Sequence, residues 1–334
     1  MTEALAEISL AGLADAPLAR KRAVAERIDA ELRRLGFFVV SDHGVPPALI
    51  DEAIATATAF FDLPLAEKMR IRSTAQGSPR GYLDYGLETL AHTTGEASPP
   101  DLKEGFGMGP LTVNTERAVI EGIAATYTPN VWPERPLEFR DTITRYYRAM
   151  EGLTQRLMEL FAIGMDLPPD FFAERFADHN STLRLIHYPP PERPPEPGQL
   201  RAGAHTDYGA LTILLGQDRP GGLQVRTPSG EWIEVRTRPY AFVINIGDLM
   251  MTWSNDRWLS NMHRVANPPP EAREASRRLS IAYFCNPNDA LWIECLPTCH
   301  GPGNPPRHAP IRAGEHRFRK IEMSKAALRA AGKT

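Results

Sequence analysis

Two side chains with metal-binding chemistry are separated by a single residue in the stretch GAHTDYGALTIL, residues 203–214. Alternate side chains of an extended strand share a face, so His205 and Asp207 are predicted to point the same way. An imidazole and a carboxylate that converge on one point suggest a metal ion. However, nine histidines and 41 acidic residues among 334 residues produce about one such pair by chance, so the pair alone carries no weight.

A metal site needs a third ligand, and His263 in the stretch SNMHRVANP can supply it. It lies on another predicted strand, and a jelly roll brings such distant strands side by side. Two histidines and one carboxylate on one side of a metal, with the other positions open, are the ligands of non-haem Fe(II) oxygenases. The open positions let iron bind a cosubstrate and O₂ together. The alternative is a buried histidine satisfied by a backbone carbonyl.

A second pair of residues suggests a receptor for a carboxylate. Arg278 and Ser280 in RRLSIAYF are two residues apart on a predicted strand and share a face. A guanidinium binds a carboxylate with two hydrogen bonds, and the hydroxyl adds a third. A buried arginine requires an acid, which is either a ligand or a protein side chain in an internal salt bridge. Tyr188 in HYPP ends an earlier strand, from which its hydroxyl could reach the same ligand.

The predicted secondary structure that must position these residues differs between the two halves of the chain. The first half is mostly helical, with apolar periodicity at residues 18–35, 50–61 and 137–167, and FFVV at residues 37–40 predicts one short buried strand. Residues 74–109 contain many glycines and few periodic apolar positions, which predicts a disordered or lid-like region. Tyr146, Met150, Leu153, Leu157 and Phe161 form the apolar stripe of the longest helix.

Short strands dominate from residue 182 onward. Seven stretches separated by proline, glycine, asparagine and aspartate have strand character, namely TLRLIHY, LTILL, GLQVR, EWIEV, AFVINIG, MHRVAN and LSIAYF. Because no gap between them is long enough for a helix, they predict antiparallel sheets closed as a sandwich or jelly roll. The fold is therefore predicted to be mostly β, a jelly roll with flanking helices that shares one core with the helical N-terminal half.

Composition excludes several classes of function. The net charge of −3 and the pI near 6.3 give no global reason to bind nucleic acid or an acidic membrane. No apolar run approaches the roughly 20 residues of a membrane span, and the acidic N-terminal stretch is not typical of a signal peptide. The three cysteines do not suggest a disulfide framework. We expect a cytoplasmic enzyme or binding protein, and nothing demands more than a monomer.

Two clusters of residues near the C-terminus are not expected to have a function. A zinc site made from Cys295, Cys299, His300 and His308 is disfavoured, because the spacing is wrong and prolines interrupt it. A basic cluster is expected to lie on the solvated face of a helix; it consists of Arg312, Arg317, Arg319 and Lys320.

The motifs together resemble a known family. GAHTDYGALTIL, VINIGDLMMTWSNDRWLSNMHRVANP and RRLSIAYFCNPN are similar to the iron-binding half of the isopenicillin N synthase-like family of Fe(II)/2-oxoglutarate-dependent dioxygenases. LRRLGFFVVSDHGVP, AFFDLPLAEKMRI and DLKEGFGMG resemble its N-terminal half. The similarity runs from about residue 8 to residue 289, in the order and spacing of the family.

The resemblance implies a role for each motif residue. His205, Asp207 and His263 would hold Fe(II). The residues that would bind 2-oxoglutarate are Arg278, Ser280 and Tyr188, and its distal carboxylate would be bound by the arginine and the serine. The implied fold is a double-stranded β-helix. We predict one dioxygenase unit over residues 1–334, with a helix-rich region at 1–175, the jelly-roll core with its site at 176–290, and a C-terminal extension and helix at 291–334. Ile186 departs from the family, because many relatives carry an asparagine there.

The resemblance further implies oxidation of a small organic substrate by O₂, with hydroxylation as the default outcome and release of succinate and CO₂. Phe106, Tyr82 and Phe284 are expected to line the substrate pocket. Four alternatives remain at this point. The iron site could serve an isopenicillin N synthase-type oxidation without 2-oxoglutarate, or it could form ethylene and succinate. The barrel could also bind a small acid without turnover, and zinc in the same ligands would give a hydrolase.

Overall fold

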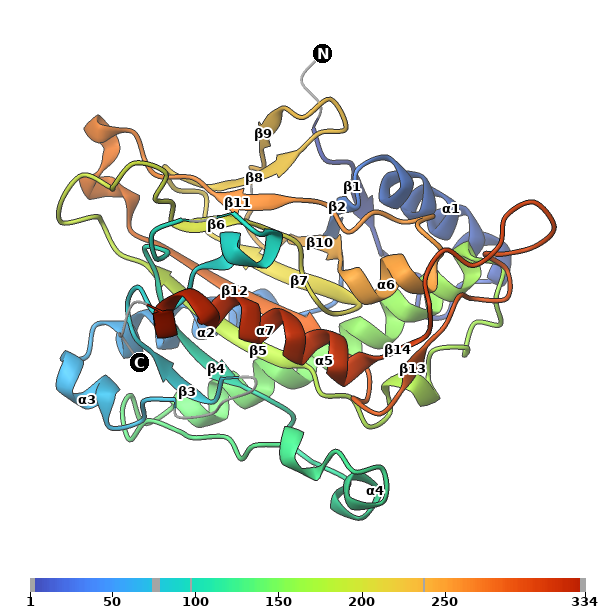
Figure 1. The fold of residues 1–334 in the computed structure, drawn as a ribbon, viewed down its shortest axis with the longest axis horizontal. Coiled ribbons are helices and arrows are strands. Elements are labelled where there is room, and N and C mark those ends of the chain that lie inside the picture. Colours follow the sequence, from blue (N-terminus) through green and yellow to red (C-terminus); the bar gives the residue numbers. More distant parts are fainter. Residues whose placement is uncertain (1–3, 74–78, 97, 237, 331–334) are drawn as a thin grey trace.

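The computed structural model describes residues 4–73, 79–96, 98–236 and 238–330, without the side chains of residues 325–330. Its strands form one large sheet and one small sheet (Figure 1). The helices are α1 (Leu18–Arg34), α2 (Pro47–Phe61), α3 (Leu65–Met69), α4 (Thr115–Ile120), α5 (Phe139–Gly164), α6 (Asp248–Trp253) and α7 (Ala313–Ala330). A 3-10 helix, η1 (Leu90–Thr94), lies between the third and fourth strands.

The large sheet has eight strands. Their spatial order is β1 (Glu7–Ser9), β2 (Phe37–Ser41), β10 (Phe242–Ile246), β7 (Leu211–Gly216), β12 (Arg278–Cys285), β5 (Thr182–Tyr188), β4 (Glu104–Met108) and β3 (Gly81–Leu83). All neighbouring strands are antiparallel except β1 and β2.

The small sheet supplies the opposite wall of the cavity. It has the order β6 (Ala202–His205), β11 (His263–Val265), β8 (Leu223–Arg226) and β9 (Trp232–Glu234), and a separate ribbon pairs β13 (Trp292–Ile293) with β14 (Ile311–Arg312). Side chains of both sheets line one cavity of about 150 Å³. This is the double-stranded β-helix that the family resemblance implied, a form of the jelly roll that the strand pattern predicted, so the predicted fold class is confirmed.

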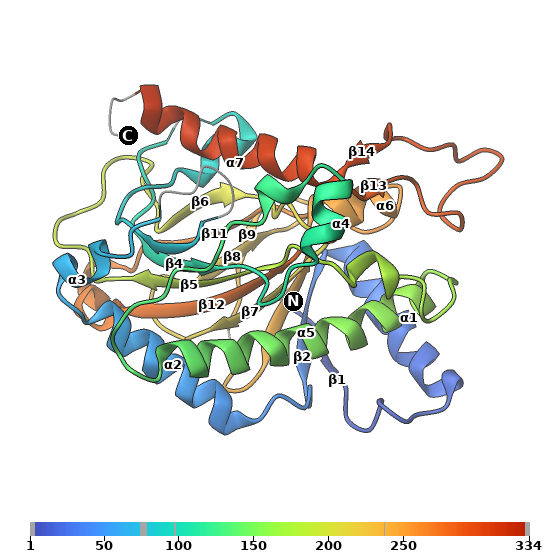
Figure 2. The ribbon, with the colours of Figure 1, turned by 90° about the horizontal axis from the view of Figure 1, so that it is seen from below.

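Helices cover the large sheet on its outer face. Figure 2 shows α1, α2 and α5 on one side of the strands and α7 on the other. The predicted stripe of α5 is buried over its whole length, from Tyr146 to Phe161. Gly36 follows Leu35, the residue that caps α1: its φ is 74°, and a Cβ there would lie 2.0 Å from the carbonyl oxygen of Leu259. Only glycine fits this turn between α1 and β2.

The prediction of a disordered or lid-like region at residues 74–109 is wrong where regular elements form. Residues 74–78 and 97 lie outside the described residues, but β3, η1 and β4 occupy much of the remainder. β4 pairs with β5 and is therefore an internal strand of the large sheet. A strand was not predicted from its sequence EGFGM, because Gly107 interrupts the apolar pattern. A Cβ at Gly107 would lie 2.6 Å from the carbonyl oxygen of Pro79, so the close packing itself requires glycine.

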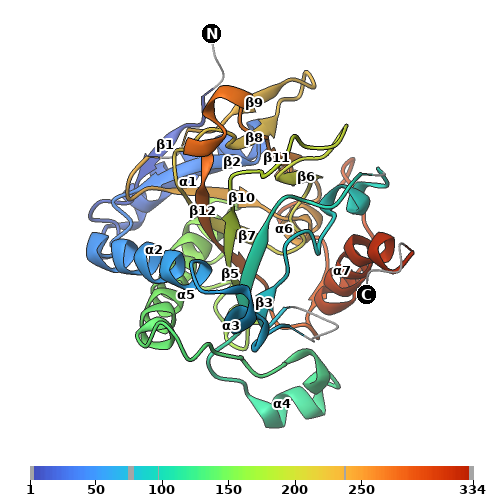
Figure 3. The ribbon, with the colours of Figure 1, turned by 90° about the vertical axis from the view of Figure 1, so that its left-hand side faces the viewer.

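The C-terminal helix α7 contributes Arg317 and Ile321 to the lining of the cavity, and Figure 3 shows the helix on the side opposite to α2 and α5. The expectation of a solvated basic face is wrong for Arg317, which is 4% exposed and forms a salt bridge with Asp289. Lys320 forms a salt bridge with Asp248 of α6, while Arg319 is exposed. The basic residues therefore attach α7 to the barrel, which a periodicity argument alone could not reveal.

Candidate metal centre and adjoining cavity

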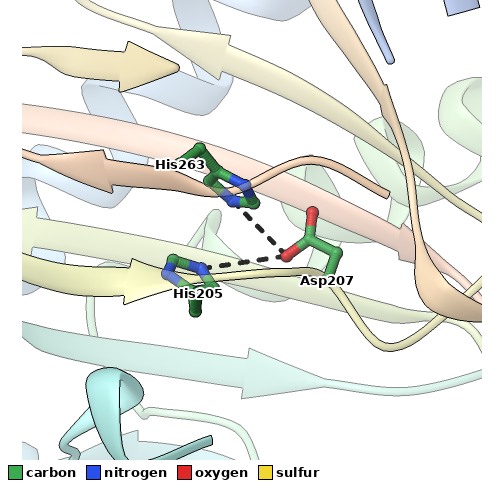
Figure 4. A group of neighbouring side chains, drawn as sticks. All are labelled: His205, Asp207 and His263. Atoms are coloured by element: carbon green, nitrogen blue, oxygen red, sulfur yellow. Dashed lines mark ion pairs between the residues drawn. The ribbon is translucent and has the colours of Figure 1, made fainter. Parts of the chain in front are cut away.

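Two strands of the small sheet bring the three predicted ligands together. His205 ends β6 and His263 begins β11, and the two residues are direct partners in the antiparallel pair. Asp207 follows β6 by two residues. Its Oδ1 lies 3.9 Å from His205 Nε2 and 3.7 Å from His263 Nε2. Figure 4 shows both rings directed at this carboxylate. All three side chains are buried, and their ligand atoms lie within 4.8 Å of one another, a spacing that suits one metal ion.

Hydrogen bonds on the outer side of the triad fix the orientation of each ligand. His205 Nδ1 lies 2.7 Å from the carbonyl oxygen of Gly203, and His263 Nδ1 lies 3.2 Å from that of Asn261. If each Nδ1 carries the proton and donates it there, each Nε2 lone pair faces the centre. Backbone carbonyls thus hold both rings, as expected for buried histidines, and histidines that bind a metal donate the same kind of hydrogen bond from their outer nitrogen.

The carboxylate of Asp207 is held just as firmly. Its Oδ2 accepts hydrogen bonds from Thr212 Oγ1 at 2.5 Å and from Asn245 Nδ2 at 2.6 Å, and all three side chains are buried. These two donors come from adjacent strands of the large sheet, β7 and β10. They leave Oδ1 directed at the histidines. Neither residue was identified from the sequence, since a buried threonine and asparagine on strands carry no distinctive signal.

His205 is a neutral imidazole at ordinary pH. Burial lowers the pKa of His205 to about 3, and the nearby His263 acts in the same direction, against the smaller opposing effect of Asp207. A neutral imidazole keeps the lone pair that a metal requires. The chemistry of the donor set, two imidazoles and one carboxylate, fits Fe(II).

The predicted carboxylate receptor lies at one end of the same cavity. Arg278 and Ser280 of β12 both line it and are each 2% exposed, and Tyr188 is the strand partner of Arg278. Burial lowers the pKa of Arg278, an effect that the Tyr188 hydroxyl opposes. Within the described residues Arg278 forms no salt bridge; its Nε donates to the carbonyl oxygen of Gln217 at 3.2 Å. The arrangement disfavours the alternative of an internal salt bridge.

Ile186 fills the position at which relatives carry asparagine. It lines the cavity beside Tyr188 and is the strand partner of Ser280. Its side chain packs in a small apolar cluster with Ala202 and Val265. An apolar contact therefore replaces the polar contact that an asparagine would offer.

The cavity wall also holds a chain of charges that the sequence did not reveal. Lys103 Nζ lies 2.7 Å from Asp101 Oδ2 and 3.4 Å from Glu88 Oε2, and Arg184 Nη2 lies 2.8 Å from Glu88 Oε1. Glu88, Lys103 and Arg184 line the cavity. These residues are spread over a region predicted to lack structure and over a strand, so no spacing in the sequence connects them.

Of the three aromatic residues expected at the pocket, Phe284 lines the cavity. The expectation is wrong for Phe106 and Tyr82, whose side chains are buried in the aromatic packing around Phe60. The hydroxyl of Tyr82 donates to Glu104, outside the cavity.

Glu104 is the centre of a separate buried cluster on β4. It accepts hydrogen bonds from Tyr82 and Lys68, and it lies 2.8 Å from His187 Nδ1. Burial alone would raise the pKa of Glu104, but these hydrogen bonds outweigh it and lower the pKa to about 2. The cluster joins α3, β3, β4 and β5 behind the cavity wall.

The chain is similar to proteins of one family over most of its length. Residues 179–287 match the family model of the 2OG-Fe(II) oxygenase superfamily, and residues 6–135 match the N-terminal region of the non-haem dioxygenases in morphine synthesis. The 2-oxoglutarate-Fe(II) type oxidoreductase hxnY of Emericella nidulans is 35% identical, over 88% of this chain and 82% of the relative. Proline hydroxylase buaE of Petromyces alliaceus is 34% identical, over 83% and 85%.

Solved structures of similar proteins have the same fold. A full-length protein of Neurospora crassa, crystallised in complex with alpha-KG and thymine, is 28% identical, with a TM-score of 0.81 over 95% of this chain and 96% of that one. JOX2 in complex with 2OG, Fe and JA is also 28% identical, with a TM-score of 0.77 over 96% and 85%.

Proposed function

Since the chain belongs to the 2OG-Fe(II) oxygenase superfamily, and is a hydroxylating dioxygenase that requires Fe(II), 2-oxoglutarate and O₂, we propose that His205, Asp207 and His263 hold its iron. The observation that carries this proposal is the convergence of three buried ligand atoms in the cavity that also contains Arg278 and Ser280. The substrate is a small organic molecule.

We assign the binding of 2-oxoglutarate to Arg278, Ser280 and Tyr188. The guanidinium and the Ser280 hydroxyl would receive the distal carboxylate, and the Tyr188 hydroxyl would contact the same molecule. The buried charge of Arg278, which no protein acid among the described residues neutralises in a salt bridge, supports this assignment. The uncompensated charge suits an anionic ligand.

When bound, iron and 2-oxoglutarate supply an oxidation by O₂ that hydroxylates the substrate and releases succinate and CO₂. The protein's own residues position and enclose the reactants. Thr212 and Asn245 hold Asp207, while Ile321 of α7 and Leu90 of η1 provide apolar wall that excludes water. Loss of water from the site protects the oxidation from side reactions.

Anaerobic addition of Fe(II) and 2-oxoglutarate tests the assignment. We expect a weak visible charge-transfer absorption and, on admission of air with substrate, succinate. Asp207→Ala should abolish both the absorption and turnover by loosening the metal, whereas Asp256→Ala, outside the cavity, should retain them. Full turnover by the Asp207 variant would remove this residue from the ligand set.

We also propose that the enzyme is a cytoplasmic monomer organised as one unit over residues 1–334, with the regions 1–175, 176–290 and 291–334. The free cysteines Cys285, Cys295 and Cys299 are compatible with a reducing compartment. The membership of β1 to β4 in the large sheet supports the single unit. In the described part of the chain, no helix is long and apolar enough to cross a membrane. Size-exclusion chromatography with light scattering tests the monomeric state.

A further inference from the structure

The cavity runs along β12 for more than the length of 2-oxoglutarate. Arg278 and Phe284 both line it and are six residues apart on β12, about 20 Å along the strand. A five-carbon 2-oxo acid spans roughly 5 Å between its terminal carbons. Asp207 is bound to Thr212, the strand neighbour of Phe284, so the metal centre lies toward the Phe284 end. On the proposed function, 2-oxoglutarate occupies the Arg278 end, and the substrate meets the Phe284 end.

The substrate end contains charges that cancel. Thr182 and Arg184 of β5 line it beside Phe284, and Arg184 forms its salt bridge with Glu88. Burial would raise the pKa of Glu88, but Arg184 and Lys103 outweigh burial and lower the pKa to about 2. Glu88 is therefore a carboxylate. Since Lys103 is also paired with Asp101, two cations face two anions and the group is neutral overall.

Two buried polar atoms in or beside this charged group form no hydrogen bond within the described residues. Among the described residues, Arg184 Nε and Thr182 Oγ1 have no hydrogen-bond partner. Each oxygen of Glu88 accepts one bond from a cation and retains a second lone pair. A donor on Arg184 thus stands beside a free acceptor position on Glu88. Unsatisfied buried groups are costly, and a ligand that pairs with both removes that cost.

We propose that the substrate is a small molecule without net charge that presents an N–H donor and a carbonyl or carboxylate acceptor side by side. The N–H donates to Glu88, and the acceptor receives the N–H of Arg184 Nε. The hydroxyl of Thr182 provides a further contact. Phe284 and Ala282 form the apolar wall against which the carbon to be hydroxylated packs.

The neutrality of the group decides between substrate classes. A molecule that carries only a carboxylate would bring an uncompensated negative charge next to Glu88 in a buried site, which is expensive. A cyclic amide or imide has no charge, and an amino acid carries balanced charges. Both offer the adjacent donor and acceptor, and the experiment distinguishes them.

Matched probes test the requirement for the N–H. Calorimetry with the protein loaded anaerobically with Fe(II) and 2-oxoglutarate would compare thymine with 1,3-dimethylthymine, and L-proline with cyclopentanecarboxylate. We expect at least one parent compound to bind and its analogue without N–H to bind about tenfold or more weakly. Equal binding of parent and analogue, or binding of neither parent, overturns the proposal. Whether thymine or proline binds identifies the source of the shared chemistry.

Variants then assign the contacts. Arg184→Lys keeps the ion pair with Glu88 but loses the second edge of the guanidinium, so affinity for the bound parent should fall about tenfold or more. Thr182→Val removes one hydroxyl with little change of shape and should weaken the same parent. The matched control is Thr154→Val on α5, a buried threonine outside the cavity, which should change nothing. Unchanged affinity in both cavity variants overturns the assignment.

The charge-transfer absorption separates this inference from the proposed function. If the unaltered protein forms the absorption with Fe(II) and 2-oxoglutarate, the cofactor assignment stands, and the probe results judge the substrate class alone. If the absorption is missing in iron-loaded protein, the cofactor assignment fails first. Both cavity variants should keep the absorption, since neither residue contacts the predicted ligands of iron.

Discussion

The hydroxyl of Thr212 offers a sharp test of how the large sheet controls the metal site. It donates to Asp207 Oδ2 at 2.5 Å, and both side chains are buried. Thr212→Val keeps the branched shape that suits strand β7 and removes only the hydroxyl. Asp207 then retains one donor, the amide of Asn245, and its carboxylate gains freedom to rotate away from the histidines.

The structure sets the expected magnitude. A buried hydrogen bond to a charged group contributes about 1.5–3 kcal/mol, and outer partners of metal ligands typically change metal affinity by about tenfold to a hundredfold. We therefore expect Thr212→Val to weaken Fe(II) binding by about tenfold to a hundredfold. Most of the activity should return at saturating iron, because the three ligands remain.

Anaerobic titration with Fe(II), and with Mn(II) as a redox-stable substitute, measures this affinity directly. Thr182→Val is the matched control, since this threonine lies in the same cavity without touching Asp207. Its metal affinity should equal that of the unaltered protein. A dissociation constant for Thr212→Val within about twofold of the unaltered value would refute the idea that this hydroxyl positions the ligand.

Three further predictions concern other parts of the molecule. Arg278→Lys should raise the KM for 2-oxoglutarate by about tenfold or more without changing iron affinity, because an ammonium cannot form the two parallel hydrogen bonds of a guanidinium. The control Arg277→Lys, on the opposite face, should not raise this KM. Equal KM values for Arg278→Lys and the unaltered protein would mean that Arg278 has only a structural role. Glu104 has a folded-state pKa of about 2 against an ordinary value of 4.5, so its stabilisation is present above about pH 4.5 and lost as the pH falls toward 2. Glu104→Gln should therefore flatten the dependence of Tm on pH in this window, and a parallel curve would contradict this account. Gly36→Ala should destabilise the fold by more than about 1 kcal/mol in urea unfolding, since φ is 74° and the Cβ would meet Leu259; unchanged stability would show that the turn can move.

Two facing pairs of candidate site residues could be predicted because their positions follow from local rules. The alternation of a strand places His205 and Asp207 together, and it places Arg278 and Ser280 together, before any tertiary contact is known. The seven strand-like stretches and the stripe of α5 are similarly local. They depend on the period of apolar residues and on the glycines and prolines between them.

The structure of residues 74–109 could not be predicted in this way. The glycines of β4 are typical of a loop, yet this strand lies inside the large sheet. Glycine is required at position 107 because the neighbouring Pro79 leaves no room for a side chain there. The buried position of Arg317 has the same cause. The basic face of α7 meets Asp289, which is 28 residues earlier in the chain.

By itself, the amino-acid sequence determined the strands of the jelly-roll core and the two facing pairs, His205 with Asp207 and Arg278 with Ser280, because each depends on residue type and on spacing within one strand. The roles proposed for these residues, and the addition of His263 and Tyr188 to them, rest on the resemblance to the family. Only the tertiary structure decided what surrounds them. Thr212 and Asn245, on the large sheet, donate hydrogen bonds to Asp207, which follows a strand of the small sheet. Arg184 donates a hydrogen bond to Glu88, which is 96 residues away in the sequence. Such pairs arise from the register of distant strands and the path of a loop, which no local period encodes.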